Sequence, residues 1–127
     1  MRAMQATEVV TALVQLPGWR LHGEGDTLAI EKDWRFASHV QAMLFVNHLG
    51  WLAESMGHHP EVVLNHAHCV VLWRTHDVKG LSRRDFEAAR QNDALPGAAL
   101  RVDATRPLWQ PMRCSLPWSL ALLAATA

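Results

Sequence analysis

The sequence has little of what marks several large classes of protein. Its two cysteines, Cys69 and Cys114, are too few for a disulfide framework or a four-cysteine metal site, and they fit a reducing compartment. Twelve Lys and Arg residues balance twelve Asp and Glu residues, so the formal net charge is zero. A neutral chain has no excess of cations to neutralise phosphates, which argues against direct nucleic-acid binding.

Long apolar runs are also missing at both ends of the sequence. Arg2 and Glu8 interrupt the apolar residues of segment 1–16, which therefore lacks the core of a secretory signal. Segment 114–127 is uncharged, but it is shorter than the roughly 20 apolar residues that cross a bilayer, and Pro117 interrupts it. We therefore expect a cytoplasmic protein that does not associate with membranes.

What is present is the composition of a globular domain. Half of the 127 residues are apolar and 19% are charged, and this length suffices for one domain with its own core. After Pro96-Gly97 the composition changes to Ala, Pro, Leu and Trp without clear periodicity. We therefore predict a domain over residues 1–97 and an appended tail over residues 98–127.

The first third of the chain has the pattern of a helix followed by a hairpin. Apolar residues recur at helical spacing over 9–16, and Pro17-Gly18 then ends the helix. Segments 19–22 and 27–36 alternate in the manner of strands, and the glycine-containing segment 23–26 predicts the turn between them.

The middle of the chain predicts a long central helix. It begins after Ser38, a good N-cap residue, and its apolar periodicity continues to Met56. Apolar residues occur nearly all round this helix, which favours burial on both sides and a subunit interface in a homodimer or homotetramer. Trp51 in this helix and Trp73 further along occupy positions typical of a core.

The remaining segments complete an alternation of helices and strands. Gly57 ends the central helix, and the Val- and Leu-rich segments 61–65 and 68–75 predict a second hairpin. Ser82, as N-cap, with Asp85 at the third helical position, begins a last helix. The predicted order is α-β-β-α-β-β-α, an α+β two-layer fold in which three helices pack on a four-stranded antiparallel sheet.

Histidine is the abundant chemical group. Five of the eight histidines lie within nineteen residues, namely His58, His59, His66, His68 and His76. Imidazole exchanges a proton near neutral pH, so His58, His59 and His76 around one pocket favour acid–base chemistry. The alternatives are a helix-end role for His58 and His59 with His76 on the surface, or a zinc site using His66 and His68. We place a turn at His66 and His68, expect both to be exposed, and expect no metal.

Three fragments carry a resemblance to a known family. They are Glu54-Ser-Met-Gly-His58-His59-Pro60-Glu61, then Thr75-His76-Asp77, then Gly80-Leu81-Ser82-Arg83-Arg84-Asp85. With their mutual spacing, they make residues 5–95 resemble the pterin-4a-carbinolamine dehydratases. The predicted element order agrees with the fold of that family.

The resemblance implies an enzyme, a hydro-lyase that converts 4a-hydroxytetrahydrobiopterin to quinonoid dihydropterin in tetrahydrobiopterin recycling. It implies three histidines around the departing hydroxyl, an acidic partner and a supporting carboxylate: His58, His59 and His76, then Glu54, then Asp85. It also implies substrate contacts from His59, Pro60 and Thr75. No metal or organic cofactor follows from it.

Two departures from the family pattern keep a second function open. Val62-Val63 stands where the family usually has an aromatic pair, and the following turn reads His66-Ala67-His68. Together with the apolar tail, these residues favour the alternative of a non-catalytic dehydratase-like binding module. Such a module would serve as an assembly factor or as a dimerisation partner of another protein.

Overall fold

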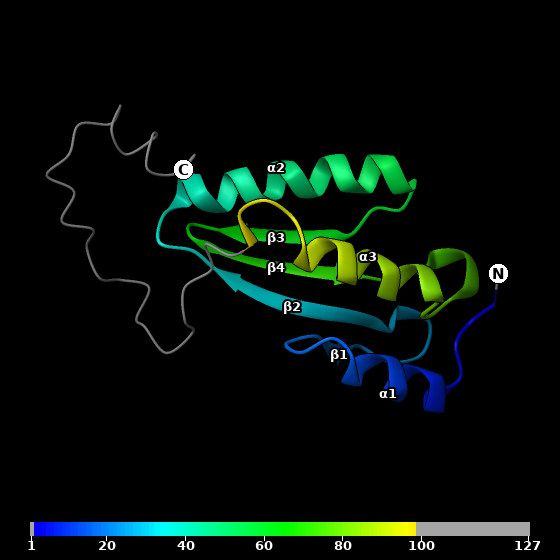
Figure 1. The fold of residues 1–127 in the computed structure, drawn as a ribbon. Helices are drawn as coiled ribbons and strands as arrows, with labels where there is room; N and C mark the ends of the chain where they lie inside the picture. The colour runs from blue at the N-terminus through cyan, green and yellow to red at the C-terminus, as the bar shows by residue number, and fades with distance from the viewer. Residues whose placement is uncertain (1, 99–127) are drawn as a thin grey trace, which may run out of the picture.

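The computed structural model describes residues 2–98, so the predicted tail, except for its first residue, lies outside the described residues. The elements, in chain order, are α1 (Ala6–Val14), β1 (Arg20–His22), the 3-10 helix η1 (Gly25–Thr27), β2 (Ala29–Arg35), α2 (His39–Met56), β3 (Glu61–Asn65), β4 (His68–Trp73), η2 (His76–Val78) and α3 (Arg83–Asp93) (Figure 1). Apart from the two short 3-10 helices, this is the predicted order.

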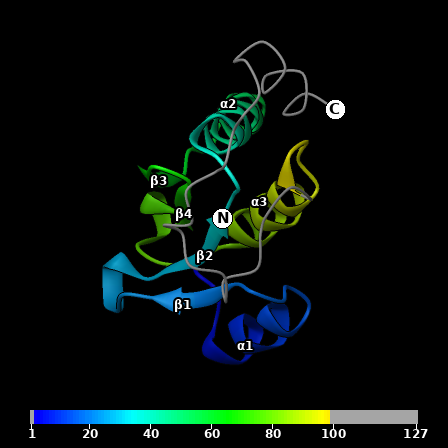
Figure 2. The ribbon, with the colours of Figure 1, turned by 90° about the vertical axis from the view of Figure 1, so that its left-hand side faces the viewer.

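The four strands form one antiparallel sheet in the order β1-β2-β4-β3. The two predicted hairpins are therefore joined through their second strands, and β2 pairs with β4 over six residue pairs from Ile30↔Trp73 to Arg35↔His68. Figure 2 shows α2 and α3 packed on one side of this sheet, with α1 beside β1. The structure confirms the predicted α+β class.

The core lies between the sheet and the helices. Alternate residues of β2 point into it, so Ile30, Lys32 and Trp34 are buried, while Glu31, Asp33 and Arg35 are half-buried. Phe45 and Leu49 of α2 complete the packing, and the rings of Trp34 and Phe45 lie 4.7 Å apart between centroids. This contact between a strand and a helix holds α2 against the sheet.

Local signals set both ends of α2. The Ser38 hydroxyl accepts a hydrogen bond from the backbone N–H of Gln41 at 3.2 Å, as an N-cap residue does. Gly57 follows the last turn with φ of 60°, a left-handed conformation that glycine adopts without strain. Both ends agree with the sequence prediction, and the second one places the two adjacent histidines directly after the helix.

Two predictions about single residues are wrong. Trp51 is 76% exposed, because it lies on the face of α2 that turns away from the sheet, whereas Trp73 is fully buried as predicted. The described chain thus buries one face of α2 and not both. His66 does lie in an exposed turn. His68 is the first residue of β4, where the strand was predicted to begin, but it is half-buried and not exposed, because it pairs with Arg35 of β2 on one side and Asn65 of β3 on the other.

No helix within residues 2–98 is both long enough and apolar enough to span a bilayer.

Candidate active site

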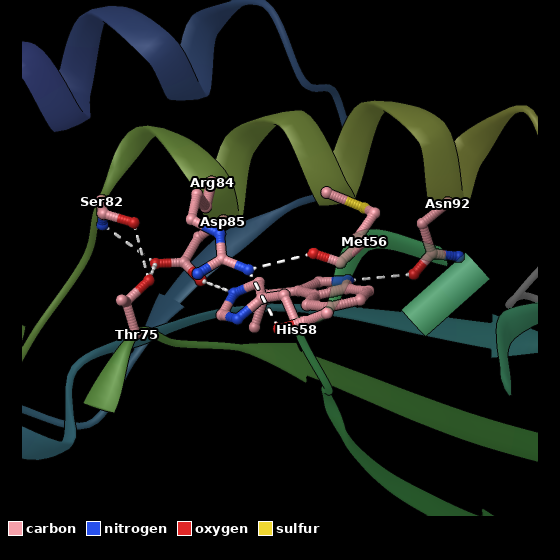
Figure 3. A network of polar contacts seen from close by, with 9 residues as sticks. Met56, His58, Thr75, Ser82, Arg84, Asp85 and Asn92 are labelled. Carbon is pink, nitrogen blue, oxygen red and sulfur yellow. Dashed lines mark hydrogen bonds and ion pairs between the residues drawn. The ribbon is translucent and has the colours of Figure 1, made fainter. Parts of the chain in front are cut away.

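The site is built where the end of α2 meets the start of α3. Arg84, the second residue of α3, donates from Nη2 to the carbonyl oxygens of Met56 and Gly57, at 3.1 and 3.0 Å (Figure 3). These carbonyl oxygens lie at the C-terminal end of α2, where the helix supplies no further backbone N–H groups to donate to them. Arg84 therefore fixes the corner of the chain from which His58 and His59 project.

His58 is buried, with 8% of its surface exposed. Its Nε2 lies 2.7 Å from Oδ1 of Asp85, and its ring packs against that of Trp73 with 5.3 Å between centroids. A carboxylate oxygen accepts, so Nε2 of His58 carries the proton that is donated. The neutral ring then keeps its lone pair on Nδ1.

Asp85 joins the histidine to a second segment of the site. Its Oδ2 accepts from the hydroxyl of Thr75 at 2.8 Å and from the backbone N–H of Ser82 at 2.9 Å (Figure 3). Since Thr75 gives its single proton to Asp85, the Ser82 hydroxyl donates to Thr75, 2.7 Å away. The predicted capping role of Asp85 is therefore combined with a contact to His58.

Glu54 and His59 form a second pair on the surface. Oε1 of Glu54 lies 2.6 Å from Nε2 of His59, and the two side chains are 73% and 62% exposed. Glu54 is in the last turns of α2, and the turn at Gly57 brings the chain back so that His59 reaches it. The carboxylate orients this ring as Asp85 orients that of His58.

His76 belongs to neither of these histidine–carboxylate pairs. It begins η2, directly after Thr75, and its side chain is exposed. Within residues 2–98 its ring makes no hydrogen bond or ion pair. The hydrogen bond from Thr75 to Asp85 nevertheless ties the segment carrying His76 to the segment carrying His58.

A groove of about 500 Å³ runs beside the surface pair. Glu54, His59 and Pro60 contribute to its lining, together with Val62 of β3 and further residues of α2, some exposed and some buried. The sequence does not reveal this groove, because its apolar pattern predicts a core position for Trp51, which lines the groove. Nor does it assign a role to Arg84, although Arg84 lies within the Gly80–Asp85 motif, which is the only signal for it.

The described residues do not assemble a metal centre. Within residues 2–98 no group of three or more His, Cys, Asp or Glu side chains is arranged so that it could hold a metal ion. His66 lies in the β3–β4 turn beside His39, the first residue of α2, and His39 Nδ1 lies 2.7 Å from the His66 carbonyl oxygen. His66 and His68, the two residues considered for a zinc site, thus lie in different elements: His66 is in the turn and His68 is in β4.

The fold and the site together define a small α+β protein with two histidine–carboxylate pairs at one corner of its sheet. The model of the family described as Pterin 4 alpha carbinolamine dehydratase matches residues 2–95. The chain belongs to this family.

Relatives and solved structures agree with that assignment. A family protein of Paracidovorax citrulli is 45% identical over 98 residues, which cover 77% of this chain and 84% of the relative. Another from Paracoccus denitrificans is 39% identical over 95 residues, covering 75% and 87% of the two chains. The crystal structure of a transcriptional coactivator/pterin dehydratase from Brucella melitensis is similar with a TM-score of 0.69 and 27% identity, covering 73% of this chain and 97% of that one.

A second solved structure shares the fold alone. It is described as a pterin dehydratase-like protein identified as a RuBisCO assembly factor in the alpha-carboxysome. The similarity has a TM-score of 0.54 at 23% identity, and covers 64% of this chain and 89% of that one. Members of this fold thus carry more than one kind of description.

Proposed function

We propose that this protein dehydrates 4a-hydroxytetrahydrobiopterin to quinonoid dihydropterin by histidine acid–base catalysis, in tetrahydrobiopterin recycling in the cytoplasm. The observation that carries the proposal is the pairing of two consecutive histidines with two different carboxylates, His58 with Asp85 and His59 with Glu54. Each pairing fixes which ring nitrogen holds the proton, as acid–base catalysis requires.

The reaction needs one proton given and one taken. Hydroxide is a poor leaving group, so a general acid protonates the C4a hydroxyl, and the C–O bond breaks with release of water. The lone pair of the adjacent ring nitrogen forms the new C=N bond, and a general base removes the proton bound to that nitrogen. No net proton is gained or lost by the protein, and no metal or organic cofactor takes part.

Three histidines are proposed for these steps. His58 and His76 would lie nearest the departing hydroxyl, and His59 would contact the pterin ring, with Pro60 and Thr75 as further substrate contacts. Two features support this arrangement. Nδ1 of His58 is left free by the bond to Asp85, and the Thr75–Asp85 hydrogen bond ties the His76 segment to the same carboxylate.

The test is the dehydration of freshly generated 4a-hydroxytetrahydropterin, followed by ultraviolet absorbance. We expect the wild-type protein to accelerate the reaction, and His58→Ala, His59→Ala and His76→Ala each to reduce the acceleration by roughly 10²-fold or more. His48→Ala is the matched control, because His48 lies exposed on α2 away from these contacts. Circular dichroism confirms that each variant is folded, and loss of activity in the His48 variant as well would argue against a specific site.

A binding module is the second candidate function. The described chain exposes three large apolar side chains on α2 and β3, namely Met43, Trp51 and Val63, and exposed apolar groups are typical of protein contact surfaces. In this case the protein would act as an assembly factor or dimerisation partner, and as a homodimer or homotetramer itself. A folded wild-type protein that gives no acceleration would favour this candidate.

A further inference from the structure

We propose that Asn92 and Trp73 are positioning residues for His58, so that α3 supports the His58 ring from both of its ends. This inference rests on the proposed function, in which His58 takes part in proton transfer, and adds what holds its ring in place. The observation is a chain of contacts in the interior. Nε1 of Trp73 donates to Oδ1 of Asn92 at 3.2 Å, and the indole packs against the His58 ring with 5.3 Å between centroids (Figure 3).

The buried face of α3 is polar at both ends and small in the middle. Its buried residues are Asp85, Ala88, Ala89 and Asn92. Asp85 and Asn92 are seven residues apart, about two helical turns, so they lie on the same side of the helix. The short alanine side chains between them let α3 lie close to β4, within reach of the indole of Trp73. The first turn of α3 therefore contacts His58 directly, and its last turn contacts His58 through Trp73.

Asn92 carries more polar groups than the interior satisfies. It is fully buried, and its Oδ1 accepts from Trp73, but within residues 2–98 its Nδ2 has no hydrogen-bond partner. A buried N–H group without a partner is destabilising, and two apolar side chains at positions 73 and 92 would avoid that cost. Stability therefore does not explain an asparagine here, whereas the orientation that its hydrogen bond gives to the indole does.

The indole in turn limits how the His58 ring can lie. Asp85 holds Nε2 of His58 at 2.7 Å, but one hydrogen bond leaves the tilt of the ring undetermined. The Trp73 ring lies against it with an angle of 32° between the planes, and Trp73 is fully buried, where close packing allows little movement. Asp85 thus sets the proton of the ring and Trp73 sets its plane. Both are needed to aim Nδ1 at a reacting atom.

The test follows the His58 ring and the reaction separately. The ring current of the indole shifts the NMR signals of the carbon-bound protons of His58, so these signals report how the two rings lie. They are assigned by their loss in His58→Ala. We expect Asn92→Leu, which removes the acceptor of Trp73, to move these signals. It should also lower kcat by about tenfold with little change in KM, less than the roughly 10²-fold that a misplaced reacting group can cost.

Gln91→Leu is the matched control for this variant. Gln91 is the neighbouring residue of α3, and its exposed amide donates to Glu87 on the surface. The same polar-to-leucine change there should leave kcat and the His58 signals as they are in the wild-type protein. Equal changes in the two variants would overturn the inference.

Asn92→Asp separates positioning from stability. The carboxyl group keeps an acceptor oxygen for Trp73, but burying it lowers the melting temperature. Assayed below the lowest melting temperature, this variant should keep kcat and the His58 signals near those of the wild-type protein, whereas Asn92→Leu should not. A kcat that follows the melting temperature across these variants would show a structural role alone and would overturn the inference.

The inference and the proposed function can fail independently. Unchanged kcat in Asn92→Leu, in an active wild-type protein, would overturn the inference and leave the proposed function standing, whether or not the His58 signals move. A wild-type protein that does not accelerate dehydration would reject the proposed function. In that case, His58 signals that move in Asn92→Leu and not in Gln91→Leu would support the positioning of His58, and unmoved signals would overturn it.

Discussion

His58 and His59 are adjacent in the sequence and have opposite surroundings. His58 is buried against Trp73 and bonded to Asp85, whereas His59 is exposed and bonded to Glu54. Since consecutive side chains of an extended segment point to opposite sides, one ring enters the interior and the other faces solvent. The same residue type can therefore do two different tasks at one corner of the fold.

Cys69 shows how burial alone changes the chemistry of a residue. It lies in β4 with no exposed surface, and desolvation of the thiolate raises the pKa of its thiol from 9.0 to about 12. The folded state thus favours the neutral thiol. Its contribution to stability is complete below pH 9 and is lost as the pH rises through 12, because the unfolded thiol ionises first.

We therefore predict that the free energy of unfolding falls between pH 9 and pH 12 more steeply in the wild-type protein than in Cys69→Ala. Urea unfolding at a series of pH values measures both slopes, and lysine titration is common to the two proteins. Iodoacetamide at pH 8 should leave Cys69 of the folded protein unmodified. Parallel slopes in the two proteins, or rapid modification at Cys69 itself, located by mass spectrometry of peptides to separate it from Cys114, would contradict the prediction.

At the scale of elements, α3 holds the end of α2. Arg84 binds two carbonyl oxygens of the last turn of α2, and Asp85, its neighbour, binds His58 just beyond that turn. A cation at a helix C-terminus also interacts favourably with the helix dipole. The first turn of α3 is therefore the support that sets the position of the histidine corner.

Arg84→Met should destabilise the protein by about 1–2 kcal/mol, since it removes two hydrogen bonds from a charged donor. Arg83→Met is the matched control, because the Arg83 side chain is 82% exposed and its ion pair with Glu8 is 4.0 Å long. Such surface changes stay within about 0.5 kcal/mol. Urea unfolding measures both, and Arg84→Lys should recover part of the loss. Equal losses of unfolding free energy in the two methionine variants would show that the hydrogen bonds of Arg84 to the end of α2 do not stabilise the protein.

At the scale of the whole molecule, Lys32 connects distant parts of the chain. Its ammonium lies 2.8 Å from Oδ1 of Asp93, 3.4 Å from the carbonyl oxygen of Pro17, and 4.5 Å from the centre of the Trp34 ring. Asp93 also accepts from Nε1 of Trp19. One buried cation thus links the loop after α1, the centre of β2 and the end of α3.

Lys32→Met should destabilise the protein by about 2 kcal/mol or more, because it leaves the Asp93 carboxylate without its cation. Adding Asp93→Asn should recover part of this loss, since the second change removes the unpaired charge. Thermal unfolding of the two single variants and the double variant gives the coupling energy. Additive effects would indicate that the pair contributes no coupling.

The sequence by itself determined the elements of this fold, because their signals are local. The apolar periodicity of α2, the Ser38 cap and the glycine at position 57 depend on residues within a few positions of one another. The three fragments that resemble the family, and with them the histidines and carboxylates of the candidate site, could also be recognised from the sequence.

Only the tertiary structure decided which groups meet. Asp85 is 27 residues from His58, and Arg84 is as far from Gly57, so no local pattern indicates either contact. The exposure of Trp51 could not be predicted either, because the sequence of an apolar helix does not indicate which of its faces packs on the sheet. Burial and pairing depend on how helices dock on the sheet, and that docking is set by contacts between segments far apart in the chain.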